Sequence, residues 1–557
     1  MMRAKPLILS FPLFTLLSLG AQIAAADTCS QNKNAGEQVV CPGPGCHGVT
    51  LAGKHLSTME KIISTTLSKA ASSNVQVFET EIHGDEVQPL VSKGHVKFGP
   101  EAAAVGDFPT VEINPDKKFQ TMYGFGAALT EACTMHIKRL PKKLKNDFMQ
   151  KTFGPNGANF NLIRLPMGGT DFADAKKGNY TYNETKNNKP DPTFKNFDMS
   201  RDEKSFELIR EARKINPNLK VMITPWSAPS WMKDSGQING GKLLPQYRQT
   251  YANYFVKVIK EYQKRGIPVD SLTIQNEPAY DSYGVPSMGM KPEEQGEFIR
   301  DFLGPTLEKH GISKRIFGHD HNWSQSERDA DPIAAVKGVK KYLKGIAYHC
   351  YGGEKWGMWD TVNHHPDLEL FQTECSGSDA GYAKAGDFHW WLDTQSVGAV
   401  NMGTTGSIAW NLCLDDKHGP VNWGKGYSGC TNCRGLVEMD FSEKDAKVKY
   451  NPEFYALAQV SRFLVPGTKR IELAGKTDGE IQSTAFQRPD GSIVMVVENL
   501  KKEPIKFRAK TPDCRALVYE VPARGATTFV WGVPGQAADE DSSDETEVSE
   551  LQPADKQ

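Results

Sequence analysis

Two glutamates stand where each would end a short apolar strand. Glu277 follows residues 271–276, and Glu374 follows residues 369–373. Pro278 disfavours a helical conformation at Glu277, so we expect both carboxylates at strand ends. Two carboxyl groups about 5–5.5 Å apart can hydrolyse a glycosidic bond with retention of configuration. The pattern predicts Glu277 and Glu374 as the carboxylate pair of such a reaction.

Residues this far apart in the chain need a scaffold that brings strand ends together. Between residues 117 and 455, short apolar, β-branched runs alternate with stretches of helical patterning. The eight runs are 122–127, 161–167, 220–225, 271–276, 315–319, 345–351, 369–373 and 406–412. The links 203–214 and 251–262 carry apolar residues on one helical face. Eightfold alternation predicts an α/β fold, a (β/α)8 TIM barrel, in which the two glutamates follow strands four and seven.

Strand patterns also lie on both sides of this region. Alternating residues occur within 75–116, and segments 481–486 and 493–497 flank a turn of Pro, Asp and Gly. We therefore expect a side β-sandwich domain built from both termini. Its N-terminal strands would lie at 75–116 and its C-terminal part at 456–535, around a catalytic barrel at 117–455.

The two ends of the chain have their own patterns. Residues 1–26 combine basic residues, an apolar run and a small-residue end, which predicts a cleaved signal peptide and a secreted, extracellular protein; an uncleaved anchor or a buried helix is the alternative. A leader with three cysteines follows at 27–74. The acidic tail at 536–557 has almost no apolar residues, so we expect it to be disordered.

Overall charge excludes some partners. The chain has 66 basic and 67 acidic residues, a formal net charge of -1. This balance gives no attraction to nucleic acid. No later segment is expected to form an integral membrane span, and peripheral contact with lipid surfaces stays open.

Remaining cysteines and three glycosylation sequons allow more than one interpretation. Cys430 and Cys433 have C-x-x-C spacing, but no second ligand pair stands nearby, so a turn or local disulfide is favoured over zinc. Cys375, beside Glu374, is interpreted as a packing residue. The sequons are at Asn179, Asn183 and Asn322, and a glycan at Asn322 would obstruct the expected mouth of the barrel.

Several ordered motifs together resemble a known family. They are Gly124 to Glu131, Pro225 to Lys233, Asn276-Glu277-Pro278, His349-Cys350-Tyr351, Thr373 to Gly377 and Trp410-Asn411-Leu412. This order is similar to glycoside hydrolase family 30, the group of glucosylceramidase (acid β-glucosidase) and endo-β-1,6-glucanases, over about residues 119–533. The resemblance implies a retaining barrel enzyme with a β-sandwich alongside and a β-glucoside substrate. It also implies no metal or other cofactor.

Roles for five further residues are carried over with the resemblance. Asn276 would bind the sugar 2-hydroxyl, Tyr351 would donate to Glu374, and Trp226 and Trp410 would offer indole faces or N–H groups, although a buried core role is the alternative for both tryptophans. Glu131 matches a family position that is Asp in animal glucosylceramidases and would hold sugar hydroxyls. The resemblance also implies that Glu277 is the acid/base and Glu374 the nucleophile. As general acid, Glu277 should have a pKa raised by its anionic neighbour, whereas Glu374 should stay ionised.

The substrate is less well defined than the chemistry. The first choice is glucosylceramide, cleaved to glucose and ceramide, and the alternative is endo-hydrolysis of a β-1,6-glucan. The loops 280–290 and 424–434 would decide between a closed pocket and an open cleft. A hypothesis of another class is a non-catalytic carbohydrate-binding module.

Overall fold

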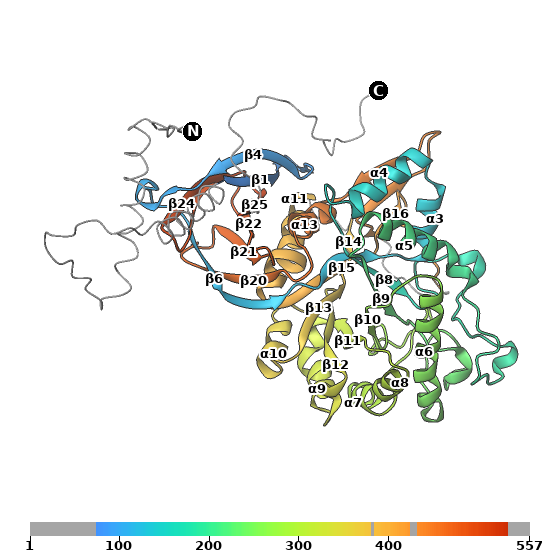
Figure 1. Cartoon of the computed structure of the whole chain (residues 1–557). Helices are drawn as coiled ribbons and strands as arrows, with labels where there is room; N and C mark the ends of the chain where they lie inside the picture. Colours follow the sequence, from blue (N-terminus) through green and yellow to red (C-terminus); the bar gives the residue numbers. More distant parts are fainter. Residues whose placement is uncertain (1–73, 380–383, 424–431, 533–557) are drawn as a thin grey trace, which may run out of the picture.

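The eight apolar runs form eight parallel strands that close into a barrel (Figure 1). The computed structural model describes residues 74–379, 384–423 and 432–532. In chain order the barrel strands are β7 Gly124–Ala128, β8 Leu162–Pro166, β9 Lys220–Thr224, β10 Ser271–Thr273, β11 Arg315–Asn322, β12 Leu343–His349, β13 Glu369–Glu374 and β15 Thr404–Ala409. Nearly all of their residues are buried, as expected where helices cover the outside of a parallel barrel. The predicted TIM barrel is confirmed.

Strands four and seven are where the sequence places them. The order around the barrel is β10-β11-β12-β13-β15-β7-β8-β9, and β15 pairs with β7 to close the ring. Glu374 is the last residue of β13. β10 is shorter than expected and ends at Thr273, so Glu277 lies in the extended segment that follows it.

Helices follow the strands and pack around the barrel. The predicted helical links are confirmed as α5 Glu203–Ile215 and α6 Arg248–Lys264. The other α-helices after the barrel strands are α3 Glu131–Arg139, α4 Lys142–Phe153, α7 Pro292–Glu297, α8 Gly304–Lys309, α9 Asp331–Ala335, α10 Gly357–His364, α11 Lys384–Trp391, α12 Val397–Asn401 and α13 Pro452–Ser461.

The second domain is a ten-stranded sheet from both ends of the described chain. Its order is β4-β1-β25-β22-β21-β20-β6-β23-β24-β5. The strands are β1 Asn74–Thr80, β4 Val91–Lys97, β5 Gly99–Pro100, β6 Thr110–Thr121, β20 Lys469–Ala474, β21 Ile481–Gln487, β22 Ile493–Asn499, β23 Ile505–Lys510, β24 Arg515–Val521 and β25 Ala526–Trp531. β21 and β22 form the predicted hairpin. β6 continues past residue 116, and its last residue, Thr121, still pairs with the sheet at Lys469.

The two domains share a packed interface, which Figure 1 shows between α13 and the sheet. The side chain of Gln459 in α13 donates to Thr80 Oγ1 at 2.8 Å and to the Ala526 carbonyl at 3.1 Å. Thr528 Oγ1 donates back to Gln459 Oε1 at 2.6 Å. These buried contacts join a barrel helix to β1 and β25, so the sheet supports the barrel from the side.

Two disulfides join elements of the barrel domain. One links Cys133 of α3 to Cys413 of the short strand β16 Cys413–Asp415, and the other links Cys350 to Cys375. The interpretation of Cys375 as a packing residue is therefore wrong. The pairing could not be predicted, because no sequence spacing shows that β12 and β13 end side by side. Cys433 is disulfide-bonded as well, which excludes it as a zinc thiolate.

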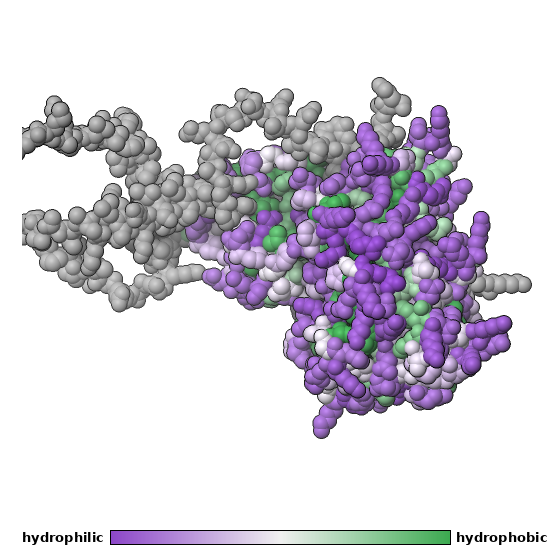
Figure 2. All heavy atoms as spheres, turned by 45° about the vertical axis from the view of Figure 1, so that its right-hand side comes forward, coloured by the Kyte–Doolittle hydropathy of each residue, from purple (hydrophilic) through white to green (hydrophobic). Residues whose placement is uncertain are grey.

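Expectations for the chain ends fall outside the described residues. These are the signal peptide, nearly all of the leader and the acidic tail, together with residues 424–431 of the second mouth loop. Among the described residues, no helix has the length and apolar character needed to cross a bilayer. Figure 2 shows one face of the molecule, covered mainly by hydrophilic residues.

All three sequon asparagines are buried or hydrogen-bonded in the structure. Asn183 is fully buried, so a glycan could not occupy this site in the folded protein. The Oδ1 of Asn322 accepts a hydrogen bond from the Tyr351 backbone N–H at 3.1 Å, next to the mouth. The first sequon, Asn179, is partly buried and donates to Asn239 Oδ1 at 2.8 Å.

Candidate active site

The two predicted glutamates meet at the mouth of the barrel. His349 Nδ1 lies 3.0 Å from Glu277 Oε1 and 3.9 Å from Glu374 Oε1. The two oxygens can therefore be no farther apart than the sum of these distances, 6.9 Å. Glu374 is 7% exposed and Glu277 is 20% exposed at their side chains, so both reach the opening from a largely dry site. This arrangement fits the approach of about 5–5.5 Å needed for double displacement.

Tyr351 makes the contact that the resemblance implies. Its hydroxyl donates to Glu374 Oε1 at 3.0 Å. The same residue is 45% exposed, so its ring also forms part of the mouth. Tyr351 thus orients the carboxylate from the solvent side.

Arg164 of β8 holds Glu374 from the other side. Alternation along β8 turns Leu162 and Arg164 to the same side, and Leu162 belongs to an apolar cluster with Phe317 of β11 and Phe371 of β13. Arg164 Nη1 donates to Glu374 Oε2, and Nη2 donates to Asp320 Oδ2 at 3.0 Å. The guanidinium is fully buried, so this cation is a fixed counter-charge for the site.

Asp320, near the end of β11, accepts hydrogen bonds from both buried cations of the site, Arg164 and His349. Its carboxylate accepts from Arg164, from His349 Nε2 at 3.1 Å and from Thr373 Oγ1 at 2.6 Å. Although burial raises the pKa of Asp320, Arg164 and His349 bring it far below its usual range. Asp320 is therefore a permanent anion that orients the imidazole between the two glutamates.

The protonation states differ from the expectation at Glu277. Burial raises its pKa, but the hydrogen bond and charge of His349 outweigh this effect, so the net pKa lies below the ordinary value. The pKa of Glu374 is raised by burial despite His349 and Arg164. His349 itself is held as a cation: burial lowers its pKa, but Glu374, Asp320 and Glu277 raise it to about 10. The prediction of a raised pKa at Glu277 failed because the imidazolium was not foreseen.

Backbone conformation at Glu277 is unusual. Its φ is 44°, and Asp320 has a φ of 50°, both in the left-handed region that non-glycine residues rarely adopt. The Glu277 N–H donates to the Asp320 carbonyl at 3.0 Å, which joins these two positions. Such strain costs about 1–3 kcal/mol per residue and concentrates at functional sites.

Asn276 is oriented for substrate binding. Its Oδ1 accepts from Arg164 Nη2 at 2.8 Å. Because a guanidinium only donates, the Asn276 amide must direct its oxygen to Arg164, which leaves its NH₂ group for another acceptor. This geometry suits the predicted donation to a sugar hydroxyl.

Trp226 and Trp410 lie against the same cation. Their rings stack with centroids 5.0 Å apart, and the Arg164 guanidinium carbon lies 4.8 Å from the Trp226 centroid. Both are nearly buried, at 5% and 3% exposure. Both also belong to a buried apolar cluster, as the alternative of a core role states, and their contact with a sugar stays a prediction.

Glu131 has a different environment from the one expected. Its carboxylate forms two hydrogen bonds with Arg201, at 2.9 and 2.7 Å, and accepts from the Asp174 backbone N–H at 3.0 Å. These contacts anchor the loop after β8 to the start of α3. These three hydrogen bonds take most of the acceptor positions of the carboxylate, and the sugar-binding role of Glu131 stays a prediction.

Asp171 is the carboxyl group that sequence analysis missed. Burial raises its pKa well above the ordinary value, and the charges of Glu374 and Glu277 raise it further. Its Oδ1 is buried without a hydrogen-bond partner among the described residues. Asp171, in the loop after β8, is better placed than Glu131 to meet a bound sugar.

One group of described residues could be considered for a metal ion. Glu277, His321 and His349 offer ligand atoms within 4.8 Å of one another. His349 Nδ1 already bonds to Glu277, and its other nitrogen bonds to Asp320. Because the imidazole is held as a cation by these partners, it has no free lone pair for a metal.

Comparisons with known proteins identify the family of this chain. Residues 122–464 match the glycosyl hydrolase family 30 TIM-barrel domain and residues 467–529 its beta sandwich domain. The endo-1,6-beta-D-glucanase neg1 of Aspergillus fumigatus is 29% identical, over 76% of this chain and 87% of its own, and the lysosomal acid glucosylceramidase of Mus musculus is 30% identical, over 77% and 85%. The solved endo-beta1,6-glucanase BT3312 is 30% identical with a TM-score of 0.74, covering 82% of this chain and 99% of its own. The match to the family TIM-barrel domain alone spans more than half of this sequence, so the chain belongs to glycosyl hydrolase family 30.

Proposed function

We propose that this glycosidase cleaves β-linked glucose by double displacement, with Glu374 as nucleophile and Glu277 as acid/base, and that its substrate is a β-1,6-linked glucan. The main support for this proposal is that both carboxylates lie within 3.9 Å of the His349 imidazolium, at the mouth of the barrel. Glu374 would attack the anomeric carbon while Glu277 protonates the leaving oxygen. Glu277 would then deprotonate the water that releases the sugar.

Polar groups at the mouth favour a sugar chain over a lipid. Three amides form a row: Asn422 donates to Asn179 at 2.5 Å, and Asn179 donates to Asn239 at 2.8 Å. The row begins at Asp171, whose carbonyl accepts from the Asn422 N–H at 2.6 Å, and ends where Asn239 donates to the Tyr283 carbonyl at 3.0 Å. The loops after strands two, three, four and eight carry these residues, so the row lies on the same rim of the barrel as the catalytic carboxylates. Amides and an exposed tyrosine ring can bind successive sugar units through hydroxyls and ring faces.

Glucosylceramide is the second candidate. The mouse glucosylceramidase is as similar to this chain as the glucanases are, so identity alone does not separate the substrates. Two exposed tryptophans follow Tyr351. Trp356 lies in the loop before α10 and is 58% exposed, and Trp359 lies in α10 and is 47% exposed. Exposed tryptophans suit peripheral contact with a lipid surface, which a glycolipid substrate would require.

A direct substrate comparison tests the choice. Purified protein is given the β-1,6-glucan or glucosylceramide in micelles, with Glu374→Gln as the blank. We expect the glucan to be cleaved with a kcat/KM at least about tenfold higher, since tenfold corresponds to 1.4 kcal/mol of transition-state binding. Preferential release of ceramide would reverse the choice, and no hydrolysis of either substrate or of an aryl β-glucoside would favour a non-catalytic module.

Asn239→Ala should affect the glucan selectively. We expect KM for the glucan to rise severalfold because one hydrogen-bonding amide is lost from the row. The KM for an aryl β-glucoside, which has a single sugar, should stay within about twofold. A matched control is Asn253→Ala, an exposed asparagine on α6 that bonds Gln249. Equal changes in KM for both substrates would show that the amide row does not bind the glucan selectively.

The pH profile should depend on His349. Its charge lowers the pKa of both glutamates, so His349→Gln should raise both and move both limbs of the kcat/KM profile to higher pH, by about one unit. Wild type should work best at acidic pH, where the pair retains the proton that the general acid needs. His364→Gln, on exposed α10, is the control and should leave the profile in place. An unchanged profile in His349→Gln would show that its charge does not govern the pair.

We also infer export from the N-terminal pattern. Two disulfides among buried residues support an oxidising destination, since such bonds are rare in the cytosol. Intact mass of protein from the culture medium should correspond to a chain starting near Asp27. A mass that includes residues 1–26 would contradict cleavage.

A further inference from the structure

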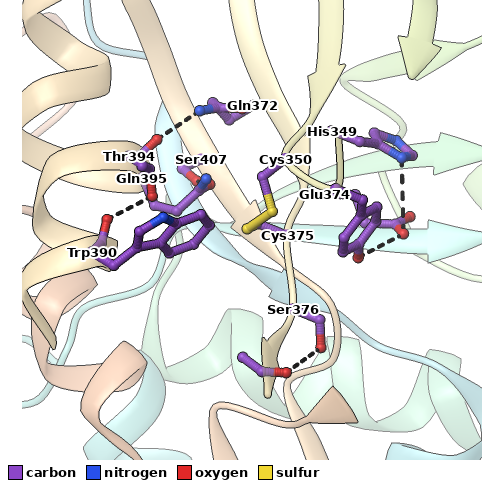
Figure 3. Close-up of a disulfide and its surroundings, with 12 residues drawn as sticks. His349, Cys350, Gln372, Glu374, Cys375, Ser376, Trp390, Thr394, Gln395 and Ser407 are labelled. Carbon is purple, nitrogen blue, oxygen red and sulfur yellow. Dashed lines mark hydrogen bonds and ion pairs between the residues drawn. A yellow bond between two sulfur atoms is a disulfide. The ribbon is translucent and has the colours of Figure 1, made fainter. Parts of the chain in front are cut away.

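The second disulfide lies where two strands deliver their catalytic side chains. Cys350 directly follows β12 and Cys375 directly follows β13, and their Cα atoms are 5.3 Å apart. Figure 3 shows the bond next to Glu374 and His349. Cys375 is fully buried and Cys350 is 9% exposed, so this is an internal link.

Residues flanking the disulfide hold both glutamates. His349, before Cys350, contacts Glu277 at 3.0 Å, and Tyr351, after Cys350, donates to Glu374 at 3.0 Å. Glu374 itself precedes Cys375. A shift of one cysteine-bearing segment against the other would therefore change the contacts of both carboxylates together.

Backbone pairing between the two strands is irregular at this point. Residues 345–348 pair in step with 369–372, but His349 then pairs with Glu374, so the register slips. Past Cys350, the Tyr351 N–H bonds Asn322 Oδ1 at 3.1 Å and the Ser324 N–H bonds the Gly352 carbonyl at 2.9 Å. These bonds tie the segment to the loop after β11, whereas the disulfide ties it to β13.

We propose that the Cys350–Cys375 disulfide is a positioning element of the active site, and that its reduction lowers turnover. This rests on the hydrolytic function proposed above. A dithiol reductant would supply two electrons and two protons, cleave the S–S bond into two thiols and itself become a cyclic disulfide. The sulfur atoms would then separate from about 2.05 Å to a non-bonded distance of about 3.5–4 Å. A displacement of about 1 Å in a catalytic geometry can reduce the rate about 100-fold.

The other disulfide provides a matched control, because its loss should affect stability more and turnover less. Cys133 and Cys413 are 280 positions apart in the sequence, and Cys350 and Cys375 only 25. Loss of a longer loop constraint destabilises more. We therefore expect Cys133→Ala/Cys413→Ala to have the larger fall in Tm and a kcat for an aryl β-glucoside within about twofold of wild type. Cys350→Ala/Cys375→Ala should have the smaller fall in Tm but a kcat reduced about 100-fold, with KM within about threefold.

Two further measurements keep the test decisive. Wild-type protein is titrated with dithiothreitol, alkylated and peptide-mapped, and residual activity should follow the fraction of intact Cys350–Cys375 while the far-UV spectrum stays constant. A crystal structure of the Cys350→Ala/Cys375→Ala variant should show the His349–Glu277 contact lengthened beyond hydrogen-bonding distance. This geometric readout does not depend on the reaction, so an inactive wild type would count against the proposed function alone. Full activity with the bond open, or an unchanged contact in the variant, would overturn the positioning role.

Discussion

Glu374→Gly is expected to reduce turnover of an aryl β-glucoside by roughly 10⁴-fold or more, because it removes the group that forms the covalent glycosyl intermediate. Azide should restore part of the rate, since a small anion can enter the space left by the carboxylate. Attack from that face inverts the anomeric centre, so the product should be an α-glucosyl azide, identified by NMR.

Two comparison variants make this result specific. Glu277→Gly keeps the nucleophile, so azide should then attack the glycosyl enzyme and give the β-glucosyl azide. Glu369→Gln lies at the other end of the same strand, where its carboxylate pairs with Arg315, and should change kcat by less than about twofold. A β-azide from the Glu374 variant would exchange the roles of the two glutamates.

Arg164→Met is expected to have the largest effect on stability. The substitution leaves Glu374 and Asp320 buried without their shared cation, and breaking such a buried pair costs about 3–5 kcal/mol. Loss of the orienting bonds to Glu374 and Asn276 should also lower kcat by about 100-fold. Urea unfolding and steady-state kinetics measure the two losses separately.

Conservative and remote variants separate charge from geometry at this position. Arg164→Lys should recover part of the stability, but not kcat, because an ammonium cannot reproduce the planar fork that reaches four acceptors. Arg315→Met removes a half-exposed arginine, whose surface pair with Glu369 is worth about 1 kcal/mol or less. If Arg164→Met were as mild as Arg315→Met, the buried network would not be what fixes Glu374.

Periodicity was sufficient to predict the barrel and the positions of both glutamates. Buried parallel strands produce continuous apolar runs, and the residue at the end of such a run must face the mouth; Glu374 satisfies both conditions. The same rule could have found two more site residues. Arg164 interrupts the apolar strand at 162–166, and Asp320 directly follows the predicted strand 315–319.

Other parts of the site depend on contacts between segments that no local pattern records. The charge of His349 arises from three carboxylates on different strands, so the lowered pKa of Glu277 could not be inferred from its neighbours in sequence. Motif matching pointed to Glu131, which lies within a distinctive glycine-rich run, and none of the matched motifs includes Asp171. Only the packing of the loop after β8 shows that Arg201 forms an ion pair with Glu131.

The pairing of β1 with β25 sets a condition on biosynthesis. Val75 pairs with Trp531, so the first strand of the sheet is made hundreds of residues before its partner. During translation its edge must stay unpaired while the intervening barrel emerges, and exposed strand edges invite association with other chains. Maturation of this glycosidase should therefore be slow at its last step, and chaperone assistance should matter most before the C-terminal strand leaves the ribosome.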